Sequence, residues 1–321
     1  MAIQVADLST YYSAMTTTDV NEIAVWPMMC NRMWEAELQG QDKVVIQDPA
    51  YNTEPASRDR GDAFTNTKAE VSSDQIVLTV NHRSEQRNVL DYEDSEETPI
   101  NWLNRIRASQ AIDMASGGPN SVNSTVYADM TRSAGFTAAQ KQTLGTDGTD
   151  FISRSGSYAG AGRGYGLILD AITRWDNYRK RGNFDGPTIG GGVGESCIVM
   201  APELFSGFRQ WLVEQKYQWD ELTRKALVDG GVLTGEDHEG IIFNTRFITS
   251  NRYAVPTGNG DWKMHAFTTA AFTFAMKSPL VQILSPTTNQ SGPEWDLKQI
   301  GRWAVKEINP AFKFEFTFKA D

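Results

Sequence analysis

The sequence contains little of the chemistry on which disulfide scaffolds and most metal sites depend. Of its 321 residues, two are cysteines, Cys30 and Cys197, and three are histidines. Two cysteines are too few for a disulfide framework. We therefore expect both to be small hydrophobic side chains in the core.

The sequence also lacks long apolar runs and a recognisable targeting segment. No apolar stretch approaches the roughly 20 residues that a membrane helix needs. The first basic residue is Arg32, so the N-terminus has no charged region of the kind that opens a signal peptide. We expect a protein without a membrane segment that is synthesised in the cytosol.

The sequence has fewer basic than acidic residues, so the net charge is -10 and the pI is about 4.9. A dedicated nucleic-acid binder usually carries a basic face, so this class is disfavoured, although weak contact with nucleic acid through a local patch is not excluded. Hydrophobic residues, by contrast, make up 40% of the chain and aromatic residues 11%. The sequence therefore predicts a folded protein with a large core.

Two segments deserve comparison with known sites. His238 lies among acidic neighbours in GEDHEG, but adjacent loop residues rarely all face one ion, so a solvated acidic loop is favoured over a metal site. GAGRGYG, Gly160 to Gly166, matches neither the dinucleotide fingerprint nor the P-loop, which favours a flexible loop. We predict no catalytic, cofactor-binding or metal-binding residue.

The N-terminal part predicts segments that cannot fold alone. Residues 1–41 have no clear core period and contain Pro27, so we expect an extended arm that lies on something else. Residues 42–97 read as a long two-stranded excursion: DKVVIQD enters it and SSDQIVLTVNH returns, with Ile76, Leu78 and Val80 alternating. Because a lone hairpin is marginal in water, we expect this excursion to finish folding against another chain.

The clearest helices follow. Thr98-Pro99 opens a helix that ends at Gly117-Gly118, and a shorter one covers Ser121 to Arg132. Tyr165 to Gly182 is amphipathic, and a strand SCIVM leads into a helix that begins at Pro202. We also expect a helical segment from about Gln218 to Val228.

From Gly240 the chain turns to strands. GIIFNTRFIT is predicted as one strand that stops at TSNRYAVP, where Ser250 and Asn251 make side-chain to backbone bonds and Pro256 fixes the loop. HAFTTAAFTFAM is predicted as another strand. In the terminal strand the phenylalanines share one face and Lys313, Glu315 and Lys319 the other, so we expect the phenylalanines beneath the helix Pro99 to Ala115.

The order of these elements resembles the major capsid protein of tailed bacteriophages, whose fold is shared with the herpesvirus capsid floor and with encapsulins. The segments that carry the resemblance are Ile198 to Glu203; Gly240 with Ser250, Asn251 and Pro256; His265 to Ala275; Arg302-Trp303; and Phe312 to Phe318. It covers most of residues 42–321.

The resemblance implies an α+β fold with an N-arm, an extended two-stranded E-loop, a peripheral domain with a long spine helix and a sheet, and an axial domain. The implied divisions are 1–41 for the N-arm, 42–97 for the E-loop, 98–165 for the peripheral domain including the spine helix, 166–275 for the axial domain and 276–321 for peripheral strands.

The implied function is that of a structural protein, not an enzyme, which assembles into an icosahedral shell around the phage genome and needs no cofactor. The implied partners are other copies in pentamers and hexamers, a scaffolding protein, a portal, a cement protein and packaged DNA bound without sequence preference, with no membrane. The implied location is the virion, after assembly in the host cytoplasm.

Three groups of residues are implied in these roles. The inter-subunit loop contacts are Arg58, Asp59, Arg60, Asp62, Lys68 and Glu70; the peripheral-domain core holds Phe312, Phe314, Phe316 and Phe318; the axial-domain turn is Ser250, Asn251 and Pro256.

Alternatives remain open. Nine tryptophans and many carboxylates would also suit a soluble sugar-active or ligand-binding enzyme, and a tail or baseplate structural protein or an encapsulin-type shell would fit the pattern of elements. Some members of the family cross-link a loop lysine, for which Lys43 and Lys68 are the candidates, but non-covalent locking is favoured.

Overall fold

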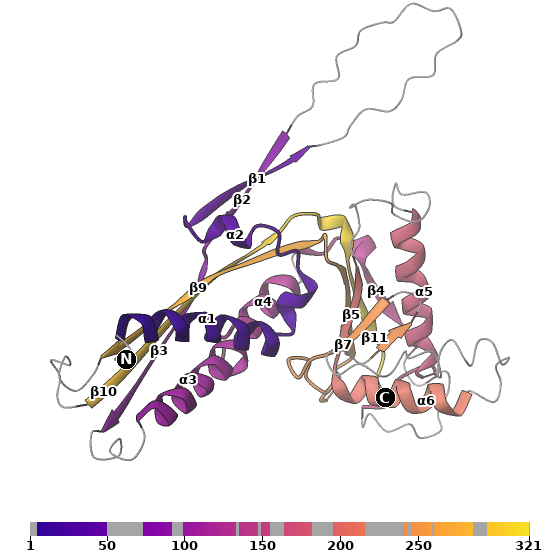
Figure 1. The fold of residues 1–321 in the computed structure, drawn as a ribbon. Coiled ribbons are helices and arrows are strands. Elements are labelled where there is room, and N and C mark those ends of the chain that lie inside the picture. Colours follow the sequence, from indigo (N-terminus) through magenta and orange to yellow (C-terminus); the bar gives the residue numbers. More distant parts are fainter. Residues whose placement is uncertain are drawn as a thin grey trace, which may run out of the picture.

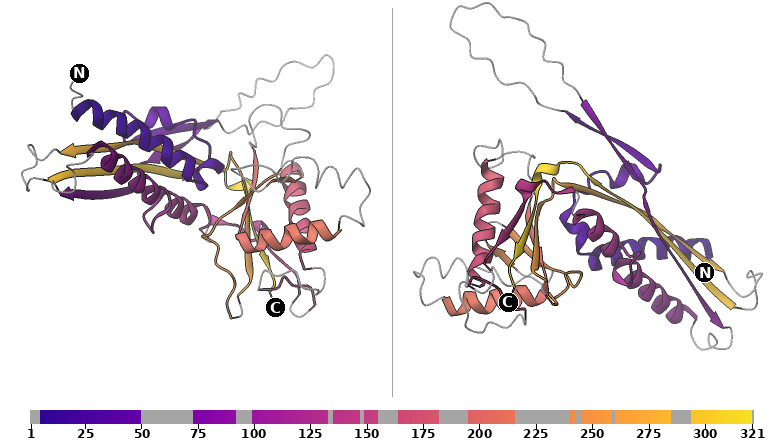
Figure 2. Two further views of the ribbon diagram at one scale, coloured as in Figure 1. Left: turned by 60° about the horizontal axis from the view of Figure 1, so that its bottom comes forward. Right: turned by 180° about the vertical axis from the view of Figure 1, so that it is seen from behind.

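The computed structural model describes residues 5–49, 73–91, 99–132, 135–146, 149–154, 164–181, 195–215, 240–242, 245–258, 260–284 and 294–320. Two bodies lie side by side, each built on its own sheet, and a two-stranded ribbon projects from the place where they meet (Figure 1). Figure 2 shows the same elongated arrangement from two further sides.

The first body is a three-stranded antiparallel sheet in the order β3-β10-β9. Its strands are β3 (His82–Asp91), β9 (Phe272–Leu284) and β10 (Glu294–Glu307). Helices α1 (Val5–Ile23), α3 (Pro99–Ser116) and α4 (Val122–Met130) lie beside this sheet (Figure 1). Gly301 of β10 allows α3 to come close, because a Cβ there would lie 2.5 Å from Met114 Sδ.

The second body is a six-stranded mixed sheet in the order β4-β11-β8-β5-β7-β6. Its strands are β4 (Lys141–Leu144), β5 (Ser196–Met200), β6 (Gly240–Ile242), β7 (Thr245–Thr249), β8 (Trp262–Thr268) and β11 (Lys313–Phe318). Helices α5 (Gly166–Arg181) and α6 (Pro202–Gln215) pack beside it (Figure 1).

The predicted helices of these two bodies are confirmed where the structure describes them. The α3 helix begins at Pro99, and a break separates it from α4, whose N-cap Ser121 accepts a hydrogen bond from Ser124 N. In α5 the apolar stripe at i, i+3, i+4, i+7 is fully buried. The segment from Gln218 to Val228 lies outside the described residues.

The expected two-stranded excursion is present as a ribbon of β1 (Lys43–Pro49) and β2 (Ser73–Thr79), paired antiparallel from Lys43↔Thr79 to Pro49↔Ser73. The expected range 42–97 is too long, however. Residues 82–91 form β3, which pairs along its whole length with β10 and so belongs to the three-stranded sheet.

The expectation of an extended N-terminal arm is wrong for the described residues. This segment forms the 19-residue helix α1, the 3-10 turn η1 (Trp26–Met29) and the short helix α2 (Glu35–Leu38). Tyr12, Thr16 and Val20 form a buried stripe at spacing i, i+4, i+8. The stripe escapes sequence reasoning because a threonine occupies its centre.

Two strands predicted as continuous are each divided. GIIFNTRFIT forms β6 and β7, which pair with each other antiparallel. HAFTTAAFTFAM is split between β8 and β9, with a turn at 269–271, and the two strands enter different sheets. A change of sheet leaves no mark on the apolar pattern, because the end of β8 and residues 272–276 at the start of β9 are buried on both faces.

The packing predicted for the terminal strand is wrong. Strand β11 pairs with β8 and β4 in the six-stranded sheet, and Phe314 packs on Trp175 and Tyr178 of α5, with ring centroids 6.4 and 5.1 Å away. The four phenylalanines are buried as expected, but they lie in the core of the six-stranded sheet and not beneath α3: Phe312, Phe314, Phe316 and Phe318.

Lys313 and Glu315, predicted on the exposed polar face of the same strand, are buried too, whereas Lys319 is partly exposed. Lys313 is 1% exposed, and its Nζ lies 2.7 Å from Glu307 Oε2 and over the ring of Phe136. Glu315 pairs with His265. The alternation of phenylalanine with charged residues predicts a half-exposed strand. In the structure each of the two buried charged side chains lies next to a partner of opposite charge or a histidine, which offsets the cost of burial.

Candidate functional site

The ribbon is attached to the body by one of its faces. Val44, Ile46 and Leu78 pack with Leu38 of α2 and with Ala304 of β10. At the base of the ribbon Lys277 Nζ lies 2.6 Å from Asp42 Oδ1, and the amine lowers the pKa of that carboxyl. The base of the ribbon is therefore fixed to the three-stranded sheet.

The opposite face of the ribbon is uncovered and carries one apolar cross-strand pair among polar residues. Val45 and Val77 are direct cross-strand partners and remain 50% and 42% exposed. A two-stranded ribbon with valine on both faces is only marginally stable when it projects into water. This face is the best candidate for a surface that another molecule covers.

The N-terminal segment lies along the outer edge of β9. The backbone of Asn31 donates to Phe272 O at 2.8 Å and accepts from Phe274 N at 2.9 Å. The Gln39 side chain donates to Met276 O and accepts from Ser278 N, both at 2.8 Å. This edge is thereby closed to strand addition over these residues.

A buried polar junction ties the N-terminal segment to both bodies. Trp26 is fully buried; its backbone N donates to Asn123 Oδ1 and its Nε1 donates to Ser250 Oγ, both at 3.1 Å. Asn123 belongs to α4 and Ser250 follows β7. One tryptophan therefore joins the helices of the first body to the second sheet.

Arg252 makes the second connection across this junction. Its Nη2 donates to Ser116 O at 2.8 Å, at the carboxyl end of α3, and to Ser121 Oγ at 3.4 Å, at the N-cap of α4. A cation suits the negative end of a helix dipole. The guanidinium thus holds both sides of the break between α3 and α4.

A buried cluster of polar side chains continues into the second sheet. Tyr253 Oη lies 2.7 Å from His265 Nδ1, and His265 Nε2 lies 3.4 Å from Glu315 Oε2. Burial raises the pKa of Tyr253 well above its ordinary value, so its hydroxyl stays protonated. Burial lowers the pKa of His265, and the histidine in turn lowers the pKa of Glu315. A neutral imidazole next to an ionised carboxylate results.

Tyr253, His265 and Glu315 lie inside the fold. All three side chains are buried, with exposed fractions of 6%, 2% and 7%. Within the described residues no three potential metal ligands gather, and no described helix is long and apolar enough to cross a membrane. The two cysteines are free and buried, and burial raises the pKa of the Cys197 thiol to about 12.

The site residues expected from the sequence fall into two groups. A turn is present after β7: Ser250 Oγ accepts from Arg252 N at 3.3 Å, Asn251 is exposed and Pro256 is buried. The loop residues Arg58, Asp59, Arg60, Asp62, Lys68 and Glu70, like His238 and its neighbours, lie outside the described residues.

Sequence reasoning missed the side chains that join the two bodies. Arg252 lies in the segment that the sequence predicts to be a turn, and nothing in its neighbourhood signals a partner more than 130 residues away in the chain. Trp26 carried a weak signal, since a tryptophan beside Pro27 in an apolar run needs a partner for its indole N–H.

Comparison with solved structures identifies the fold. The chain is similar to the capsid of Cyanophage P-SCSP1u (TM-score 0.53, 9% identity) and the capsid of Ralstonia phage GP4 (TM-score 0.53, 11% identity), covering 87% of this chain and 84% of that chain in both cases. It is also similar to the mature capsid of bacteriophage PhiM1 (TM-score 0.50, 16% identity, 91% and 88% covered). No protein-family model and no curated protein matches the sequence.

The chain therefore has the α+β fold of tailed-phage capsid proteins over most of its length, and the fold class predicted from the sequence is confirmed. At this level of identity the likeness concerns the fold.

Proposed function

We propose that this chain is a structural protein that assembles with copies of itself into the closed shell of a bacteriophage capsid. The observation that carries the proposal is the ribbon, which is anchored on one face and presents the exposed pair Val45 and Val77 on the other. The fold shared with three phage capsids supports it.

The proposed partner of the ribbon is a neighbouring copy in a pentamer or hexamer. Shells built from one chain need many overlapping contacts, because each interface is modest and the stability comes from their number. The segment that connects β1 to β2 in sequence carries charges of both signs, among them Arg58, Arg60, Asp62 and Glu70. In this proposal they pair with complementary charges of the neighbour.

The remaining parts of the proposal follow from the first. A shell of this kind works with a scaffolding protein, a portal and a cement protein, encloses DNA without reading its sequence, and resides in the virion after assembly in the host cytoplasm. The protein acts as a building block and not as an enzyme, and its parts correspond to an N-arm, an E-loop, a peripheral domain and an axial domain.

The test is the assembly state of the purified chain, produced alone and together with a candidate scaffolding protein. Size-exclusion chromatography followed by negative-stain imaging is expected to show closed shells or rings of capsomers. Tubes or stacked rings would favour a tail or baseplate protein. A monomer at every salt and protein concentration would contradict the proposal.

A further inference from the structure

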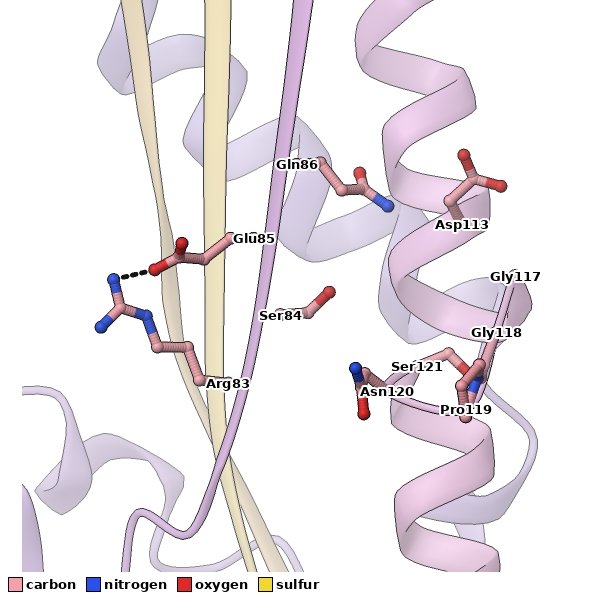
Figure 3. Close-up of a pocket in the computed structure, with 10 residues that line it drawn as sticks. All are labelled: Arg83, Ser84, Glu85, Gln86, Asp113, Gly117, Gly118, Pro119, Asn120 and Ser121. Atoms are coloured by element: carbon pink, nitrogen blue, oxygen red, sulfur yellow. Dashed lines mark hydrogen bonds and ion pairs between the residues drawn. The ribbon is translucent and has the colours of Figure 1, made fainter.

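A layer of polar side chains crosses the first body between its helices and its sheet. This polar layer consists of Thr16 of α1, Gln86 of β3, Arg107 and Gln110 of α3, and Gln299 of β10. Gln86 and Gln299 are direct cross-strand partners, and Figure 3 shows the Gln86 side chain pointing from β3 toward α3. The other four residues are at most 5% exposed. The layer therefore lies inside the packing of the body.

Much of the hydrogen-bonding capacity of the polar layer is unused. Each of its five side chains has a buried atom that bonds to no described residue: Thr16 Oγ1, Gln86 Oε1, Arg107 Nε, Gln110 Oε1 and both amide atoms of Gln299. The bonds that exist are fewer. Gln110 Nε2 donates to Leu297 O at 3.3 Å, and Arg107 Nη1 donates to Asp19 Oδ2. Because a buried polar atom without a partner costs free energy, the layer weakens the packing at this level.

The polar layer separates two apolar clusters. The small cluster draws buried residues from α1, α3, β9 and β10: Tyr12, Leu103, Val281, Ile283 and Leu297. Farther along α1, α3 and β10, Val20, Met114 and Trp303 belong to the large core cluster. In each of these three elements the polar residues lie between a residue of the small cluster and a residue of the large one. The layer thus crosses all three elements at one level.

The small cluster holds together the end of the first body that lies farthest from the second sheet (Figure 1). This outer end comprises residues 5–15 of α1, 99–106 of α3, 281–284 of β9 and 294–298 of β10. Opening it would expose the atoms of the polar layer to water, which supplies the hydrogen bonds that they lack. That gain offsets part of the cost of exposing the small apolar cluster.

We infer that the polar layer divides the first body into two units, and that the outer end opens while the remainder stays folded. The fold then contains a defined place at which helices and sheet part together, set by side chains and not by a loop. The inference concerns the single chain and does not depend on the proposed function.

Native-state hydrogen exchange of the full chain in low concentrations of urea, below the concentration at which it assembles, tests the division. Amides of residues 103–106 and 295–297 are expected to exchange at least tenfold faster than those of 111–115 and 303–305. Their exchange should also depend less on urea, since a partial opening exposes less surface. Equal rates with an equal dependence on urea would show that the body opens as one unit and would overturn the inference.

Gln299→Met tests whether the polar layer is the cause. Methionine has a similar length but no amide, so the unpaired atoms disappear and exchange at 103–106 and 295–297 should slow by about tenfold. Gln282→Met is the matched control, because Gln282 is exposed on β9 of the same sheet, and it should leave these rates unchanged. Unchanged or faster exchange in Gln299→Met, or a chain that does not fold, would show that the amide stabilises the packing and would overturn the inference.

Thr16→Val repeats the test on the helical side of the polar layer. Valine keeps the shape of threonine without its unpaired hydroxyl, so exchange at residues 9–15 of α1 should slow as well. Thr18→Val is the control on the same helix, since Thr18 is exposed and its hydroxyl donates to Ala14 O at 3.3 Å. If both variants change the rates equally, the effect belongs to helix preference and the inference fails.

Discussion

Replacing Val45 and Val77 together with threonine is expected to impair assembly while leaving the chain folded. Threonine keeps the shape and the strand preference of valine but carries a hydroxyl in place of one methyl group. Because the two side chains are about half exposed and face away from the body, the ribbon keeps its packing on Leu38 and Ala304.

The magnitude follows from the exposed area. Fully burying a valine stabilises by roughly 1.5–3 kcal/mol, so two half-exposed valines together contribute about 1.5–3 kcal/mol when a partner covers them. Threonine keeps one of the two methyl groups, so the loss is at most of that size, and the concentration needed for assembly rises by up to about a hundredfold.

Light scattering during a concentration series measures this threshold, and thermal unfolding of the unassembled chain checks the fold. Val255→Thr is a matched control, since Val255 is exposed on a turn of the second body. An unchanged threshold for the double variant would refute the idea that this face of the ribbon is covered in the particle.

Three further predictions concern the stability of the unassembled chain. Phe314→Ala is expected to lower the free energy of unfolding by about 3–5 kcal/mol, measured by urea titration, because the ring is buried against α5; a loss below 1 kcal/mol would contradict the packing. Arg252→Met is expected to cost about 1–3 kcal/mol, since Ser116 O loses its donor; hydrogen exchange should increase at the end of α3, and uniform exchange would argue against the bridge. Acid should destabilise the fold: the pKa of His265 lies below its ordinary 6.5 and that of Glu315 below 4.5, so the unfolded chain binds these protons more readily and stability falls as pH drops below about 6.5. In His265→Gln the part of this loss near pH 6 should disappear, and an unchanged pH profile would exclude the histidine as its source.

The sequence predicted those elements whose pattern depends on local rules. The helix at Pro99 has a favourable start and a glycine stop, and the helix at Gly166 carries a complete apolar stripe. The ribbon strands alternate between buried and exposed positions, and they pair as expected. In each case the information lies within one segment of the chain.

What could not be predicted depends on contacts between distant segments. The local pattern predicts that Lys313 and Glu315 face solvent, because their partners Glu307 and His265 lie elsewhere in the sequence. This wrong prediction also placed the terminal strand beneath the wrong helix. Thr16 concealed the buried stripe of α1, and the role of Arg252 depends on a helix end far away in sequence. Pairing of buried polar groups is a tertiary property that no local pattern reports.

A single-particle reconstruction of the assembled chain tests the central claim most directly. The account predicts a closed shell with this chain as its wall, in which the Val45 and Val77 face of each ribbon is covered by a neighbouring copy. Assemblies in which that face is open to solvent, or a chain that stays monomeric with every candidate partner, would contradict it.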